Sequence, residues 1–264
     1  MARSFSLSLA AADIVAQLLG VNIRLFPFEI PSVGQLQEDR VRIARAVFLD
    51  LARRGLIHDG TVDPELELAM RTLSDHVIAI AVMGTVAKDK EIYARASATG
   101  DTGVLAVKEA QSLRFELIRP TSLALTLVGL LPKAQAGPGQ SVTITSQGQP
   151  TGRHRRGDEE QQNLFGPVRS LRGSSDQQLR IAESYLARPR TGTGFFAVSG
   201  RDRSSGRETR AGGLMWLDTD AGRYLNLSHP PAEDGSIRST ISPADSTRLT
   251  HQLGEMIESV APRR

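Results

Sequence analysis

Few side chains in this sequence have the spacing that a catalytic or metal-binding motif requires. The five histidines, at positions 58, 76, 154, 229 and 251, form neither an HExxH nor an HxH pair. A zinc site without cysteine normally needs such a cluster, and the chain has no cysteine at all. There is also no G-x-S-x-G elbow to present a nucleophilic serine. We therefore expect no metal, no cofactor and no catalytic residues, and predict that the protein is not an enzyme.

The glycine-rich stretches do not have the pattern of loops that bind phosphate. A P-loop needs glycine followed by lysine, and no Gly-Lys pair occurs in the chain. The stretch from Gly192 to Ala197 resembles a GxGxxA fingerprint, but that fingerprint follows a strand and opens a helix, whereas this one opens a strand. We interpret the match as chance.

One acidic stretch imitates a calcium loop. Residues 218–222 read Asp-Thr-Asp-Ala-Gly, as at the start of an EF-hand loop, but position twelve from Asp218 is His229, where a bidentate glutamate is required. Asp and Gly are also the residues that tight turns favour. A hairpin turn therefore explains this stretch better than a calcium site.

Composition limits the remaining function classes. The chain has 264 residues, of which 40% are hydrophobic and 23% charged, as in ordinary globular proteins. Its longest apolar runs are far shorter than the roughly 20 residues that a membrane-spanning helix needs, and its N-terminus lacks the apolar core of a signal peptide. We expect a cytoplasmic protein without membrane insertion.

Arginine is concentrated in the Gly/Ser-rich stretches 153–172 and 188–210, but aromatic residues make up only 5%, so no nucleic-acid partner is expected.

Periodicity predicts the elements of the first half. Alternation over residues 5–9 predicts a strand, and helices are predicted over 11–19, 33–54 and 64–73, the last capped by Asp63 with Pro64 in the first turn. Short apolar runs at 77–86, 92–98, 104–107 and 113–118 predict four strands, which must pair antiparallel because no helix separates them. Pro120 then precedes an apolar helix over 121–131.

The same order of elements recurs in the second half. A helix over 176–187 precedes strands at 194–198, 211–217, 223–227 and 236–241. A last helix follows, with Ser242 as N-cap, Pro243 in the first turn, Asp245 at the third helical position and an apolar stripe that continues to Val260. We infer an internal duplication, which predicts an α+β fold with a central antiparallel β-sheet flanked by helical bundles in two pseudo-twofold-related halves.

The two halves are separated by a polar stretch. Residues 146–162 contain no periodic apolar residue, which predicts a flexible linker. The expected organisation is an N-terminal half over 1–145, this linker, and a C-terminal half over 163–264, the halves together forming one compact unit.

Two groups of residues match the pattern of a known family. In the second half they are the stretch from Trp216 to Leu225, the stretch from Asp234 to Asp245 and the terminal amphipathic helix. In the first half they are residues 46–56, Asp59-Gly60 and residues 63–66, which correspond to a helix, its Gly-Leu cap and a second helix. In the order of these motifs the sequence resembles the EspG family, the cytosolic chaperones of type VII (ESX) secretion systems. The similarity spans nearly the whole chain except the linker.

The resemblance implies binding rather than catalysis. Such chaperones hold the tip of the PPE protein in a PE–PPE heterodimer, keep it soluble and mark it for secretion, with no small-molecule substrate. By analogy, contact would involve the sheet, the hairpin loop at residues 84–90 and the C-terminal helical bundle. The candidate partner-binding residues are accordingly Val86, Lys88, Lys90, Leu253, Met256 and Ile257. Amphipathic helices usually bury their apolar stripe, so core packing is the stronger interpretation of the last three.

Two other functions stay open at the level of sequence. One is an α+β enzyme or a small-ligand-binding protein whose site is assembled from residues far apart in the chain. The other is a nucleic-acid module that uses the two arginine-rich stretches, and it predicts salt-sensitive retention of DNA or RNA. Co-purification with a PE–PPE pair would separate the chaperone from both alternatives.

Overall fold

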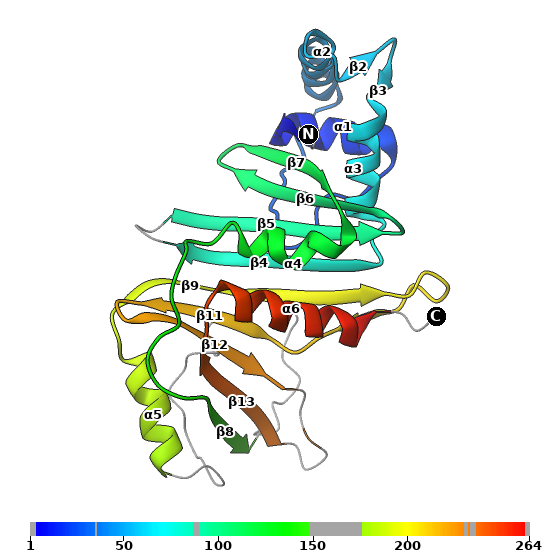
Figure 1. The fold of residues 1–264 in the computed structure, drawn as a ribbon. Helices are drawn as coiled ribbons and strands as arrows, with labels where there is room; N and C mark the ends of the chain where they lie inside the picture. Colours follow the sequence, from blue (N-terminus) through cyan, green and yellow to red (C-terminus); the bar gives the residue numbers. More distant parts are fainter. Residues whose placement is uncertain are drawn as a thin grey trace.

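The computed structural model describes residues 4–34, 36–86, 90–147, 176–229, 232 and 236–261. Its central feature is an 11-stranded sheet in the order β1-β7-β6-β5-β4-β9-β11-β12-β13-β8, with β10 paired to β9 (Figure 1). Every pairing in this sheet is antiparallel. The strands are β1 (Ser4–Ser8), β4 (Ile78–Val86), β5 (Lys90–Thr99), β6 (Thr102–Glu109), β7 (Ser112–Ile118), β8 (Val142–Gln147), β9 (Arg190–Arg201), β10 (Glu208–Arg210), β11 (Leu214–Thr219), β12 (Gly222–Ser228) and β13 (Ser236–Pro243).

The sheet has a pseudo-twofold arrangement about its middle. Strands β4 and β9 pair there, from Ile78 opposite Gly200 to Thr85 opposite Thr193. Moving outward, β5, β6 and β7 follow β4 on one side, and β11, β12 and β13 follow β9 on the other. Each series leads into a helix, α4 (Leu123–Val128) or α6 (Ser246–Val260). The predicted fold class and the repeated strand order are thus confirmed.

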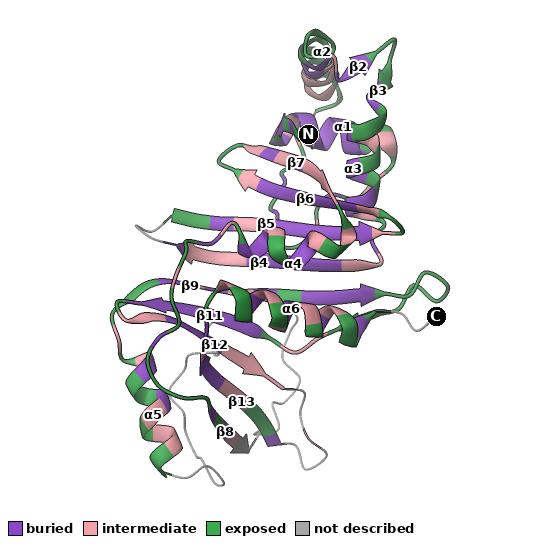
Figure 2. Ribbon diagram, in the orientation of Figure 1, coloured by how far each residue is buried: buried purple, intermediate pink, exposed green. Residues whose placement is uncertain are grey.

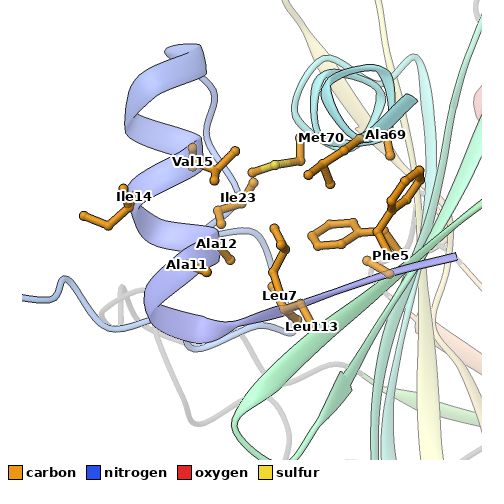
Figure 3. Close-up of a cluster of buried hydrophobic side chains, with 14 of the residues drawn as sticks. Phe5, Leu7, Ala11, Ala12, Ile14, Val15, Ile23, Ala69, Met70 and Leu113 are labelled. Atoms are coloured by element: carbon orange, nitrogen blue, oxygen red, sulfur yellow. The ribbon is translucent and has the colours of Figure 1, made fainter. Parts of the chain in front are cut away.

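Helices cover both faces of this sheet, as the alternation of side chains along the strands requires. On one face, α4 and α6 pack on Ala94, Ala96 and Leu225. The opposite face of the N-terminal half carries α1 (Leu9–Leu19) and α3 (Pro64–Ser74), whose core includes Phe5, Leu7 and Met70 (Figure 3). The opposite face of the C-terminal half carries α5 (Asp176–Leu186), where the ring of Tyr185 stacks on that of Tyr224 at 4.6 Å.

One part of the N-terminal half projects beyond the sheet. It consists of α2 (Gln37–Arg53) and the two-stranded sheet of β2 (Ile57–His58) and β3 (Thr61–Val62). Helix α2 packs on α1 and β2, and only Val47 and Leu51 of its residues are buried. Figure 2 shows that most of its surface is exposed or half-buried.

Local signals placed several of the elements correctly. The burial of β1 alternates as predicted, and α1 ends at Gly20, which adopts the left-handed conformation at φ 66°. The Asp63 side chain caps α3 by accepting hydrogen bonds from the backbone N–H groups of Glu65 at 3.0 Å and Leu66 at 3.2 Å. Among the described residues, no helix is both long enough and apolar enough to span a membrane.

Several predicted helix boundaries were wrong, including the start of α1, which begins at Leu9 rather than at residue 11. Helix α2 starts at Gln37 rather than at residue 33, and α4 is confined to residues 123–128 after the 3₁₀ turn Pro120–Ser122. The last helix starts at Ser246, because Ser242 and Pro243 still belong to β13 and pair with β12. Asp245 is the N-cap instead, and its Oδ1 accepts a hydrogen bond from the Arg248 N–H at 2.8 Å.

Strand β8 lies where the first half was expected to end. It pairs with β13, from Val142 opposite Ile241 to Gln147 opposite Ser236, so the last residues of the proposed N-terminal half join the sheet of the C-terminal half. Residues 146 and 147 of the expected linker lie within this strand, and residues 148–162 are outside the described part of the chain.

Candidate partner-binding surface

Helices α4 and α6 lie side by side across the middle of one face of the sheet (Figure 1). The apolar stripe of α6 recurs every three or four residues and packs against the sheet, with Leu249, Leu253, Met256 and Val260 all buried. Leu253 is 0% exposed and Met256 is 5% exposed. We therefore assign these two residues to core packing, which corrects their prediction as contact residues.

A groove runs between the two helices, and we call it the α4–α6 groove. One end is a cavity of about 540 Å³ whose lining includes Leu123, Leu125, Gly254 and Ile257. Ile257, the third residue predicted on α6, is half-buried and so remains available to a partner. A side chain at Gly254 would meet no atom within 4 Å, so the α6 side of the groove is open at that point.

The other end of the groove is larger and more polar. It is a cavity of about 850 Å³, with Leu125 and Thr250 lining both ends, so the two cavities adjoin. Lys133, Asp245 and His251 line this second end. The groove therefore combines an apolar centre with a polar, charged rim, which is the usual composition of a protein–protein contact.

Leu125 is the most informative residue of the groove. It lies on α4 between the two cavities and is 64% exposed, although leucine normally favours burial. Sequence reasoning did not single it out. The sequence nevertheless indicates that an apolar residue of this helix must be exposed. The helix α4 is apolar on nearly all sides, and a short helix packed on a sheet can bury only one side.

The hairpin of β4 and β5 contributes a neighbouring surface. Val86 pairs with Lys90 at its end, but Val86 is only 7% exposed, whereas Lys90 is exposed. Lys88 lies outside the described residues. A cavity of about 600 Å³ beside the hairpin is lined by Val86, Lys90 and also by Leu130, which follows α4. The hairpin and the end of α4 thus border the same hollow.

Aromatic packing fixes the sheet beneath the groove. Gly84 and Gly194 are directly paired, and both lie against the indole ring of Trp216 on the next strand. Trp216 is fully buried and also contacts Phe196, with ring centroids 5.2 Å apart. Gly194 of the GxGxxA stretch therefore makes room for this ring within β9, consistent with interpreting the match as chance.

The acidic stretch that imitates a calcium loop is the turn between β11 and β12. Asp218 is engaged by Arg223, whose Nε and Nη2 donate to the two carboxylate oxygens at 2.6 and 2.9 Å. Arg223 also donates to the carbonyl oxygen of Pro132 at 2.9 Å, which anchors the chain that leaves α4. The hairpin interpretation is confirmed, and among the described residues no group of three or more His, Cys, Asp or Glu side chains could hold a metal ion.

Comparisons with known proteins show the family and the fold to which the chain belongs. A search of curated proteins gave no match. Among solved structures, the chain resembles the Mycobacterium tuberculosis type VII secretion system chaperone EspG5, solved in complex with a PE25–PPE41 dimer. The TM-score is 0.65 at 13% sequence identity, over 98% of this chain and 97% of that one, so the likeness extends to the whole fold. The model of the EspG family matches residues 8–255, nearly the full length, and the chain therefore belongs to the EspG family.

Proposed function

We propose that this protein is a non-enzymatic, cytosolic chaperone that binds the PPE tip of a PE–PPE heterodimer and directs the pair to a type VII secretion system. Membership of the EspG family supports this proposal, as does the likeness to a chaperone solved with a PE–PPE dimer. The observation that carries it is the α4–α6 groove, with the exposed Leu125 at its centre.

The proposed site has three parts. Leu125 and Ile257 supply apolar contact in the groove, Lys133 and His251 supply a polar rim, and the β4–β5 hairpin extends the surface through Lys90. Lys88, which lies outside the described residues, is included because it belongs to the same hairpin in the sequence. Apolar side chains in a water-excluded centre usually contribute most of the affinity of such an interface, so we assign the largest contribution to Leu125.

The test is co-elution on a sizing column with a PE–PPE pair encoded in the same genome and expressed together with this chain. The wild-type protein is expected to elute as a complex. Leu125→Glu is expected to lose the complex, because it places a charge in the apolar centre of the groove. The matched control is Leu68→Glu, since Leu68 is also exposed, at 43%, but lies on α3 on the opposite face of the sheet.

These measurements distinguish a wrongly placed binding site from a wrongly assigned function. Unchanged capture by a folded Leu125→Glu protein would place the site elsewhere. Failure of the wild-type protein to bind any PE–PPE pair of its genome would contradict the function itself. Loss of capture by both variants would point to a general effect of surface charge rather than to the groove.

A further inference from the structure

The projecting helix α2 has exposed apolar side chains on its outer side. Leu49 is 59% exposed and Val41 is 44% exposed, and Ala52 is also exposed. Spacings of eight and three residues place Val41, Leu49 and Ala52 along one side of the helix. Phe48, beside them, is half-buried and packs against the core together with the buried Val47 and Leu51. The helix is thus apolar toward the protein and also apolar on part of its outer side.

The charges on the outer side are arranged asymmetrically along the helix. Glu38 lies in the first turn and Arg53 in the last, and neither makes an ion pair within the described chain. By contrast, Asp39 pairs with Arg42 at 2.7 Å and Asp50 with Arg54 at 3.2 Å. Glu38 and Arg53 are separated by about 22 Å along the axis, at 1.5 Å per residue, and so cannot meet within one molecule.

An antiparallel copy of the same helix would satisfy both features at once. It would place Glu38 of each molecule beside Arg53 of the other and bring the two apolar stripes together, with the helix dipoles opposed. We propose that α2 pairs with α2 of a second copy of this chain, giving a homodimer. This surface shares no residue with the lining of the α4–α6 groove, so each copy keeps its groove free.

The dimer is weak for two physical reasons. One helix pair buries much less than the 1,200–2,000 Å² typical of stable complexes. Arg45 also lies on the outer side near the midpoint of α2, where the two copies bring like charges together. We therefore expect a dissociation constant on the order of 10–100 µM. The same reasoning predicts that Arg45→Ala, which removes the repulsion and retains a good helix former, dimerises more tightly.

The experiment is sedimentation equilibrium of the full-length protein at rising concentration. The mass of the wild-type protein is expected to increase from 28.5 kDa toward twice that value. Leu49→Glu should raise the dissociation constant at least tenfold, whereas the control Leu68→Glu, at an exposed position of α3, should leave it unchanged. A mass that stays at 28.5 kDa up to about 1 mM would overturn the proposal, as would equal effects of the two leucine variants.

A charge exchange tests the antiparallel arrangement directly. Glu38→Arg and Arg53→Glu, each alone, should weaken self-association by about two- to fivefold, as expected for an exposed ion pair. Mixing the two variants should restore the wild-type constant, because the mixed dimer has an acidic side chain opposite a basic one at both ends. Failure of the mixture to recover would exclude antiparallel pairing.

Helix content from circular dichroism verifies that each variant is folded. Capture of a PE–PPE pair, which depends on the groove, should be the same for all of these variants.

Discussion

The carboxylate of Asp13, on α1, accepts a hydrogen bond at 2.9 Å from Nη1 of Arg40, on α2. The same carboxylate also accepts from the Val33 N–H at 3.1 Å and from the side chain of Arg24. The Asp13 side chain is only 2% exposed, whereas the two arginines reach solvent. One buried charge thus ties together α1, the segment that follows it and the start of α2.

Replacing Asp13 with asparagine should destabilise the protein by about 2–3 kcal/mol, since a buried ionic network loses its only anion. Asp50→Asn is the matched control, because Asp50, on α2, forms an exposed ion pair with Arg54. Loss of this exposed pair should cost less than about 0.5 kcal/mol. The free energy of unfolding in urea provides the measurement. Equal losses for both variants would show that Asp13 has no special structural role.

The contribution of Asp13 should also depend on pH. Burial alone would raise the pKa of its carboxyl, but the Val33 N–H, Arg40 and Arg24 together outweigh burial and hold the pKa below its ordinary value of 3.8. A carboxyl whose pKa is lowered in the folded state stabilises the fold fully above the unfolded-state pKa. This stabilisation is lost as the pH falls through the folded-state pKa. The difference in unfolding free energy between wild type and Asp13→Asn should therefore be constant from pH 7 to about 5 and shrink below pH 4.

Two glycines should respond in opposite ways to alanine. A methyl group at Gly194 would collide with the ring of Trp216 and the carbonyl oxygen of Met83, neither of which can move without shifting the sheet. We expect Gly194→Ala to cost about 2 kcal/mol or more. Gly254 lies in α6 with open space around it, so Gly254→Ala should stabilise the helix by up to about 1 kcal/mol. Thermal melting of both variants tests this contrast.

Much of the fold was predictable because its signals are local. Ser8, Asp63 and Pro64 mark helix starts through their own side chains, and alternation in β1 requires only one buried face. The errors arose where distant pairing decides the structure. Ser242 has the chemistry of an N-cap, but it pairs with Leu225 and remains in β13. Strand β8 is likewise defined by its partner β13 rather than by its own short sequence.

The candidate site was less predictable than the fold. The sequence shows that α6 has an apolar stripe, but not which part of it meets the sheet. Packing places Leu253 and Met256 underneath the helix and leaves Ile257 at the groove. Leu125 belongs to a helix that the sequence correctly predicts as apolar, yet its exposure depends on α6, more than 100 residues later in the chain.

The buried ion pair between Asp218 and Arg223 gives a further prediction. Arg223 is 0% exposed, so Asp218→Asn would leave a guanidinium group buried without its counter-ion. We expect a loss of about 3–5 kcal/mol, and a lower melting temperature measures it. Asp50→Asn is again the control, because Asp50 pairs with Arg54 at an exposed site. If Asp218→Asn melts at the same temperature as the control, this ion pair does not hold the β11–β12 turn against the chain at Pro132.

Basic side chains gather at the end of the β4–β5 hairpin. Lys90, Lys108 and Arg114 line the cavity of about 600 Å³ beside it, together with Glu91 and Glu109. The Nζ of Lys108 lies 5.3 Å from the centre of the Tyr93 ring, and Arg114 is paired with Glu109 at 2.7 Å. Among the described residues of this hollow, Lys90 is therefore the cation freest to meet a partner.

The last prediction concerns that hairpin. Lys88→Glu combined with Lys90→Glu should weaken capture of the PE–PPE pair and alter its dependence on salt, because charges at the edge of an interface act mainly on association rate and screening. Charge reversal at the exposed Lys90 should change the free energy of unfolding by less than about 0.5 kcal/mol, and urea unfolding of the double variant verifies that it is folded. Arg203→Glu with Arg207→Glu is the matched control: both residues are exposed between β9 and β10, away from the hairpin. The measurement is the rate of PE–PPE capture at two salt concentrations. An unchanged rate for the lysine variant would exclude an electrostatic role for the hairpin. The α4–α6 groove would then be the sole proposed contact.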